Sequence, residues 1–173
     1  MSRTTTVVVG ERGFWTLDDA FAVWIAYLVE QIDQQASNDA WLVRLAADWR
    51  VAAVVTDYGA DAGDLTPEQS QRLRDVAMAA RQRAANAGDI PVERLRQWIM
   101  FDNEAVSEGF SRTGDRVEAA RVLEVADGFI ALVDGSLPLD PPTGTWFLGT
   151  GHGWSVMELH PEARTQPRFP RRR

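Results

Sequence analysis

The chain has 173 residues, of which 45% are hydrophobic and 25% charged, and a formal net charge of -7 at pH 7. Such a length fits one domain with one core, and the composition excludes wholesale disorder, collagen-like repeats and disulfide scaffolds. The pattern predicts a mainly α fold: a single-domain bundle of about five helices with a small antiparallel β-hairpin near the C-terminus. We expect this domain over residues 1–160, followed by a flexible, arginine-rich tail over residues 161–173.

Two residue types are missing, and their absence excludes several chemistries. The chain has no cysteine, which removes thiolate metal sites, iron–sulfur ligation and cysteine nucleophiles. All 18 basic residues are arginine, which removes the lysine of a phosphate loop and the lysine of a Schiff base. A lysine-free chain rich in alanine, aspartate and arginine is what a GC-rich bacterial genome encodes. The sequence indicates no cofactor.

The apolar stretches bear on where the protein resides. Residues 1–9 lack the apolar run of a secretory signal. The longest apolar stretch, residues 20–29, is about half as long as a membrane-spanning helix must be. We therefore expect a cytoplasmic protein without a transmembrane segment.

The first predicted helix covers residues 17–32, where apolar residues recur at spacings of three and four. Thr16 is placed to cap it, and Asp18 and Asp19 lie in the first turn, where the helix dipole favours acids. Because its middle is apolar on nearly all sides, we expect this helix to run through the centre of the bundle.

Two further helices follow, separated by a loop. The second begins at about Asp39 and ends by Gly59, and residues 57–66 mix glycine with acids in the manner of a loop. The third begins at Thr66, where a threonine, a proline and a glutamine form a capping box, and it runs to about Ala85.

The last two helices are predicted from weaker signals. The fourth starts near Pro91, passes through Trp98 and extends toward Val106. The fifth follows a capping arrangement at residues 115–118 and ends at Gly135.

Prolines and glycines dominate the chain after Gly135, so helical packing should end there. Residues 145–148 and 155–159 are expected to form two short strands around a glycine-rich turn at residues 149–153, with residues 4–9 joining them at an edge. The predicted sheet closes one end of the bundle.

The charges are unevenly distributed along the chain. Residues 66–100 carry six arginines and four acids, whereas residues 1–65 carry four arginines and ten acids, and residues 101–163 three and eleven. The arginines of the middle segment read as a solvated helix face with pairs such as Glu68 and Arg72. Since no dominant basic face emerges, we expect no nucleic-acid partner and no binding to anionic membranes, but a basic protein partner.

His152 is the best single candidate for catalysis, because its imidazole lies among glycines that allow other groups to approach the backbone. The alternative interpretation is an exposed histidine in a tight turn. Ser155 lies in a near match to the nucleophile elbow of serine hydrolases, but the final glycine and the expected acid-then-histidine order are missing.

The candidate binding residues fall into two groups. Asp57 and Asp61, with Asp64, have a spacing that would align carboxylates for a hard cation on a helix, but the neighbouring glycines favour solvated loop acids, so no metal is predicted. Aromatic residues outside the regular helices form the second group, which could meet where the two chain ends converge: Trp15, Trp146, Phe147 and Trp154, together with His152.

These observations leave two classes of function open. The first is a non-catalytic binding protein that acts through its acidic surface, of which an immunity- or antitoxin-like inhibitor is one form. The second is a small enzyme or ligand-binding protein that uses the glycine-rich loop around His152.

Overall fold

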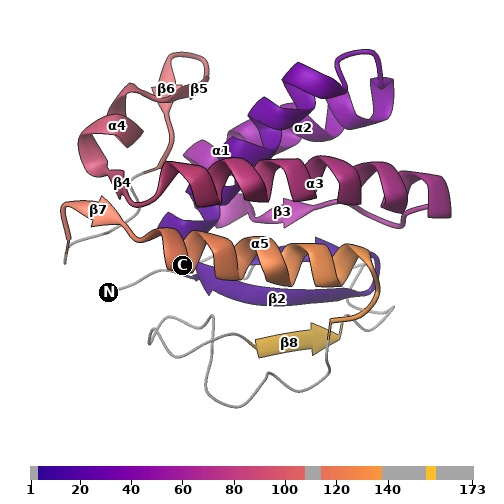
Figure 1. Cartoon of the computed structure of the whole chain (residues 1–173). Helices are drawn as coiled ribbons and strands as arrows, with labels where there is room; N and C mark the ends of the chain where they lie inside the picture. Colours follow the sequence, from indigo (N-terminus) through magenta and orange to yellow (C-terminus); the bar gives the residue numbers. More distant parts are fainter. Residues whose placement is uncertain (1–3, 108–113, 138–154, 159–173) are drawn as a thin grey trace, which may run out of the picture.

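The computed structural model describes residues 4–107, 114–137 and 155–158, and this part of the chain is mainly α (Figure 1). The α-helices in it are α1 (Asp18–Gln35), α2 (Ala40–Val54), α3 (Pro67–Ala87), α4 (Val92–Gln97) and α5 (Ala119–Val133), with a 3-10 turn η1 (Thr56–Tyr58). One sheet has the strand order β3-β1-β2-β8, formed by β1 (Thr4–Val9), β2 (Arg12–Leu17), β3 (Ala60–Asp61) and β8 (Ser155–Glu158). Two short ladders pair β4 (Ile90–Pro91) with β7 (Arg116–Val117) and β5 (Ile99–Phe101) with β6 (Glu104–Ala105).

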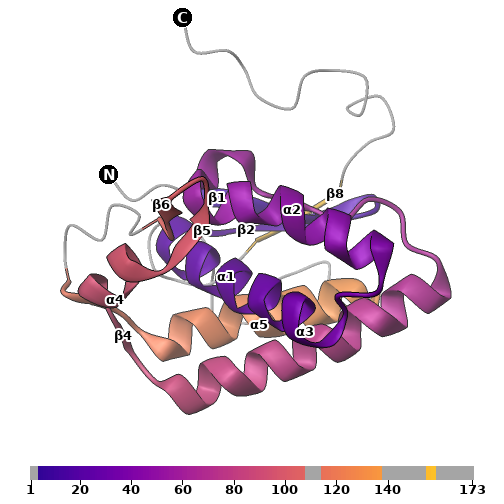
Figure 2. The same ribbon diagram turned by 90° about the horizontal axis from the view of Figure 1, so that it is seen from above.

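Helix α1 is the central element, as the apolar run predicts. Every residue from Ala20 to Val29 is buried, because the helix packs against α2, α3 and α5 and also contacts β1 and β2. Seen from above, α1 lies between α2 on one side and the α3–α5 pair on the other (Figure 2). The described helices are too short or too polar to cross a membrane.

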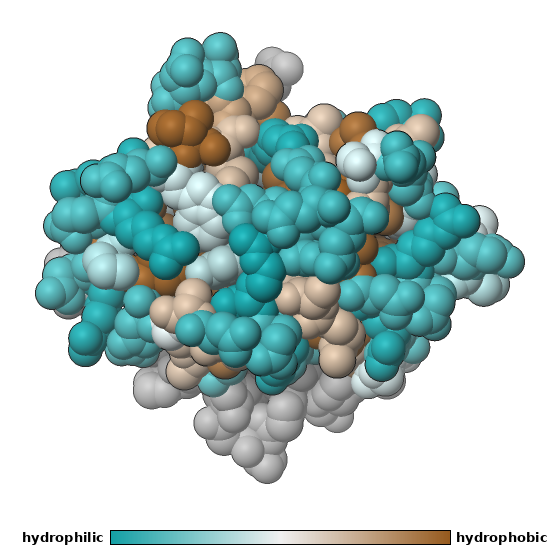
Figure 3. All heavy atoms as spheres, turned by 45° about the horizontal axis from the view of Figure 1, so that its top comes forward, coloured by the Kyte–Doolittle hydropathy of each residue, from teal (hydrophilic) through white to brown (hydrophobic). Residues whose placement is uncertain are grey.

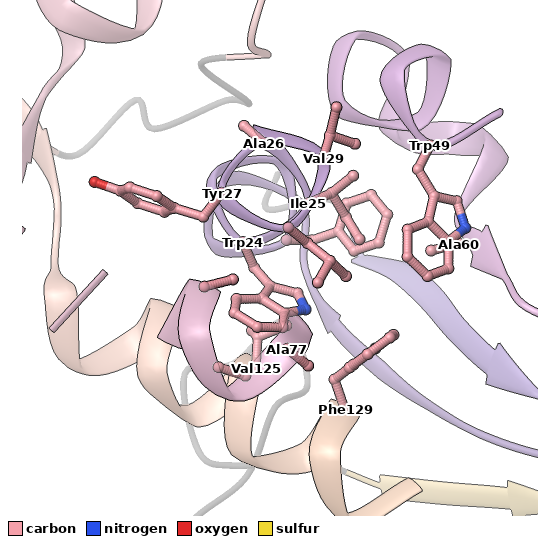
Figure 4. Packing of buried hydrophobic residues seen from close by; sticks show 14 of the residues in the cluster. Trp24, Ile25, Ala26, Tyr27, Val29, Trp49, Ala60, Ala77, Val125 and Phe129 are labelled. Carbon is pink, nitrogen blue, oxygen red and sulfur yellow. The ribbon is translucent and has the colours of Figure 1, made fainter. Parts of the chain in front are cut away.

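The core gathers around three aromatic rings. Trp24 of α1 and Trp49 of α2 each meet Phe129 of α5 edge to face, with ring centroids 5.7 Å apart in both pairs (Figure 4). All three side chains are essentially inaccessible to solvent. Edge-to-face contact places the positive rim of one ring against the negative face of the other, which adds to the benefit of burial.

The sheet differs from the predicted one. Its hairpin lies at the N-terminus, where Val9 pairs with Arg12 across a two-residue loop, and this second strand was not predicted. Residues 155–158 do form a strand, but they pair with β2, whereas the sequence placed residues 4–9 at that edge. The predicted strand at residues 145–148 and the tail at residues 161–173 lie outside the described residues.

Of the three predicted helix caps, one is confirmed: Thr66 forms the complete capping box with Gln69. The capping arrangement predicted at residues 115–118 is wrong, because α5 has no side-chain cap at Glu118 and its first N–H, that of Ala119, donates to Asp89. At the predicted start of the second helix, the Asp39 carboxylate accepts from the backbone N–H groups of Trp41 and Leu42. The prediction for Thr16 is wrong, because this threonine belongs to β2 and is buried, while α1 begins two residues later without a side-chain cap at Leu17.

Two predicted boundaries also need correction. The loop at residues 57–66 contains part of η1 and all of β3, and β3 extends the sheet in parallel with β1. The fourth helix is only six residues long and ends at Gln97, because the chain after Trp98 turns back on itself as the β5–β6 hairpin.

Candidate functional site

The structure brings only part of the predicted site residues into view. Trp15 lies half-buried in β2, opposite Thr6. The remaining members of this group lie outside the described residues: Trp146, Phe147, His152 and Trp154. The structure therefore neither assembles nor separates that group.

Asp57 and Asp61 are exposed and lie on η1 and β3, not on one helix. The side chain of Asp61 accepts a hydrogen bond from the backbone N–H of Gly63 at 2.9 Å, a local contact that is common in tight turns. Among the described residues, no group of three histidines or acids is arranged to hold a metal ion.

A different surface stands out by its exposed apolar side chains. Of the six large hydrophobic residues that are exposed in the described part of the chain, four lie on two segments that each contact α2, namely the residues that follow its C-terminal end and strand β5. These four are Val55, Tyr58, Ile99 and Phe101, whereas the other two, Val43 and Met78, lie elsewhere on α2 and α3.

The β5–β6 hairpin presents two of these side chains. Ile99 and Phe101 are 53% and 47% exposed, while Met100 between them, where the register of the ladder shifts, packs against the core. Asp102 and Asn103 form the turn with φ of 45° and 65°, values that short polar side chains tolerate best among non-glycine residues.

The same segments carry negative charge only. Residues 99–107 contain Asp102 and Glu104 and no arginine, and residues 55–66 contain Asp57, Asp61 and Asp64 and no arginine. In the space-filling view, a strongly apolar patch lies beside hydrophilic atoms at the upper left, where the hairpin projects (Figure 3). We call the set Val55, Tyr58, Ile99, Phe101, Asp102 and Glu104 the docking face.

The hairpin is tied to the helices through Trp98, its first neighbour along the chain. The indole N–H of Trp98 donates to one oxygen of the Glu30 carboxylate at 2.6 Å, and Arg83 of α3 donates to the other oxygen at 2.8 Å. The Trp98 ring also meets Tyr27 edge to face, and the guanidinium of Arg94 lies 5.8 Å from its centre. An acid, a tryptophan and an arginine from three elements therefore meet at the base of the hairpin.

The arginines of α3 have a different role from the predicted one. The sequence reads them as a solvated face with pairs inside the helix, but four of them pair with acids of other elements. Arg72 pairs with Asp39, the N-cap residue of α2, and not with Glu68, and the remaining pairs are Arg74 with Asp134, Arg81 with Asp127 and Arg83 with Glu30. These guanidinium groups neutralise neighbouring acids of the same chain.

An open pocket of about 580 Å³ lies where the turn before α2 meets α3. Its charged groups are already paired, because the Asp39 carboxylate accepts hydrogen bonds from the N–H groups of Trp41 and Leu42 and from the Arg72 guanidinium. Asp75, also in its wall, accepts from the amide of Gln71 at 2.8 Å. The pocket thus offers less to a ligand than its size suggests.

Sequence reasoning missed the docking face, although one signal for it is present. Ile99, Met100 and Phe101 are followed directly by an Asp-Asn pair, and an apolar run before such a pair indicates a hairpin turn. Helical spacing of Leu95, Trp98 and Ile99 gave the competing prediction. Glu30 carries no sequence signal, since its role depends on residues 53 and 68 positions away.

Comparison with known proteins gives no relative: no family model, curated protein or solved structure matches the chain.

Proposed function

We propose that this protein binds a basic protein partner without catalysing a reaction, and that the partner contacts the docking face. The observation that carries the proposal is the exposure of Ile99 and Phe101 on a hairpin whose only charges are Asp102 and Glu104. Apolar residues held in water beside charges of one sign are typical of an interaction surface. The sign of the charges favours a partner with arginine or lysine around an apolar centre.

The distribution of arginine supports the same assignment. Four arginines of α3 are engaged with acids of the same chain, so this helix does not offer the free basic stripe that nucleic acid requires. The chain carries a net charge of -7, which steers basic partners toward it. A protein that covers a basic site of its partner would act as an inhibitor of that partner.

A peptide titration tests the chemistry of the docking face. The probe is a short fluorescein-labelled peptide of alternating arginine and leucine, compared with one of alternating glutamate and leucine, and binding is followed by fluorescence anisotropy. We expect only the basic peptide to bind, and its Kd to rise between about 50 mM and about 300 mM salt because surface charges are screened.

Phe101→Ser should weaken binding at least about tenfold, as expected for an anchor residue. Met78→Ser, which changes an exposed apolar residue of α3, is the matched control. Equal binding by wild type and Phe101→Ser would contradict the proposal.

The absence of lysine makes a second experiment specific for a partner. A carbodiimide joins carboxylates to amines, and apart from its N-terminus this chain supplies only carboxylates. Cross-links formed in lysate of expressing cells therefore join this protein to lysines of other proteins. The proposal requires that cross-linked peptides include Asp102 or Glu104, and that Phe101→Ser removes those cross-links. Cross-links that map only to acids outside the docking face would count against it.

A further inference from the structure

The β5–β6 hairpin belongs to the segment between α3 and α5, whose two ends lie side by side. Ile90 pairs with Val117 and Pro91 with Arg116, so the β4–β7 ladder closes the excursion between α3 and α5. Val92 donates to the carbonyl of Asp115 at 2.9 Å next to this ladder. The hairpin itself therefore needs contacts of its own to hold a fixed position against the helices.

Three hydrogen bonds supply those contacts at the base of the hairpin. The N–H of Val106 donates to the carbonyl of Trp98 at 2.8 Å and closes the base, and the N–H of Ser107 donates to the carbonyl of Ala53 in α2, also at 2.8 Å. On the other strand, the only side-chain hydrogen bond described for Trp98 goes from its indole N–H to Glu30. The strand β6 is thus fixed to α2 by backbone, and β5, which contacts α2 and packs Met100 against the core, is fixed to α1 by a side chain.

Glu30 is itself held in place by two helices. It lies on α1, where it is about one-third exposed, and Arg83 of α3 binds the oxygen that Trp98 does not use. Arg83 also reaches the side-chain amide oxygens of Gln31 and Gln34 at 3.3 and 3.4 Å. The carboxylate has little freedom to turn, so it can transmit the position of α1 and α3 to the tryptophan.

We propose that Glu30 is a positioning residue for the docking face: it fixes the β5–β6 hairpin at one angle to α1 and α3, and partner affinity depends on it although it lies outside the docking face. This inference rests on the proposed function. The physical reason is that a two-stranded hairpin is marginally stable by itself, so a partner would otherwise have to order it on binding. Fixing the hairpin beforehand avoids that loss of entropy.

The test measures the hairpin and its binding separately. Amide hydrogen exchange of residues 99–105 reports on the hairpin without any partner, and the arginine–leucine peptide reports on affinity. For Glu30→Ala, we expect faster exchange in the hairpin and peptide binding weaker by about fivefold, which is less than the full effect of one charge-assisted hydrogen bond because the peptide can still order the freed hairpin. Trp98→Phe should behave in the same way, and the double variant should add little, because both changes break one contact.

Two further variants separate positioning from general stability. Glu30→Gln keeps an acceptor for Trp98 but loses the ion pair with Arg83, so it should retain most of the hairpin protection. Asp127→Ala removes an equal charge and breaks the Arg81 pair on the same α3, at a place without described contact to the hairpin, and should leave exchange and affinity unchanged. Unfolding temperatures of all variants show whether each one is folded.

The outcomes distinguish this inference from the proposed function. The positioning role is wrong, and the docking face stands, if Phe101→Ser weakens peptide binding while Glu30→Ala either leaves hairpin exchange unchanged or speeds it without weakening peptide binding. If wild type does not bind the peptide while Glu30→Ala still speeds exchange in the hairpin, the docking proposal fails, and the finding that Glu30 holds the hairpin in place stands. Equal effects of Asp127→Ala and Glu30→Ala would also overturn the positioning role.

Discussion

Tyr27 and Trp98 meet edge to face, with ring centroids 4.9 Å apart and planes at 75°. Figure 4 shows the Tyr27 ring pointing away from the cluster around Trp24 and Phe129, on the side of α1 opposite to Trp49. Its hydroxyl is buried, and within the described part of the chain it has no hydrogen-bond partner. Packing of the ring therefore removes the Tyr27 hydroxyl from water without giving it a hydrogen-bond partner.

Replacing this tyrosine with phenylalanine should stabilise the protein. Tyr27→Phe keeps the ring contact with Trp98 and removes the hydroxyl, so the free energy of unfolding should rise by about 1 kcal/mol. Urea denaturation followed by tryptophan fluorescence measures this change. A loss of stability would mean that the hydroxyl has a partner, such as an ordered water.

The same substitution should change the response to alkaline pH. Burial raises the pKa of Tyr27 above its ordinary value of 10.0, an effect that the nearby Arg94 and Arg83 partly offset. The folded state thus holds the Tyr27 proton to higher pH than the unfolded state. The stability that this proton binding contributes, relative to the ionised side chain, is present below pH 10.0 and is lost as pH rises through the folded pKa. Because lysine and cysteine are absent, the tyrosines are the only side chains that ordinarily titrate at about pH 9 to 12. Stability of Tyr27→Phe should fall less than that of wild type over this range.

Asp39 at the start of α2 is an acid-sensitive contact. The hydrogen bond from Arg72 holds the pKa of Asp39 below its ordinary value of 3.8, and the N–H groups of Leu42 and Trp41 add to this effect. Its contribution is present above pH 3.8 and is lost as pH falls through the lower folded pKa. Asp39→Ala should cost about 1 to 2 kcal/mol near neutral pH, as for other helix caps.

A neutral analogue and a nearby acid serve as controls for that prediction. Asp39→Asn keeps an oxygen for the helix cap but cannot titrate, so its stability should fall less than that of wild type below pH 3.8. Asp75→Asn removes a charge from the same pocket wall without touching the cap and should behave like wild type. The measurement is thermal unfolding by circular dichroism across acid pH.

Gly59 should tolerate substitution far less than Gly63, although both have φ near +65°. A Cβ at Gly59 would lie 2.6 Å from Thr6 Oγ1 and 2.7 Å from the Thr6 carbonyl oxygen, whereas no described atom lies within 4 Å of one at Gly63. Gly63→Ala should cost only the backbone strain, about 1 kcal/mol. Gly59→Ala adds a clash with the backbone of β1 and should cost roughly 2 to 4 kcal/mol. Equal losses of the free energy of unfolding in the two variants, measured by chemical denaturation, would refute the close approach of Gly59 to Thr6.

Local signals predicted the helices well where the ends of a helix are decided by neighbours in sequence. The capping box predicted at Thr66 and the contacts that start α2 at Asp39 involve residues no more than three positions apart, so the sequence contains each whole interaction. The apolar run of residues 20–29 likewise predicted the buried centre of α1, because a helix that is apolar all round cannot face water.

The errors arise where contacts between distant residues decide the structure. Val7 and Val8 are both buried, as are Gly13 and Phe14, so β1 and β2 lack the alternation by which a strand is recognised. Only the pairing of β2 with β1 and β8 makes Thr16 a strand residue instead of a helix cap. Similarly, no local rule tells that Met100 turns toward the core while Ile99 and Phe101 remain in water.

The β4–β7 ladder has a consequence for how such a protein can diversify. Since Ile90 and Val117 are paired neighbours, the chain between them begins and ends at one place beside α3 and α5. If the proposed docking role holds, an exchange of the exposed hairpin within this segment would change the partner and keep the scaffold, much as loops are exchanged on an antibody framework.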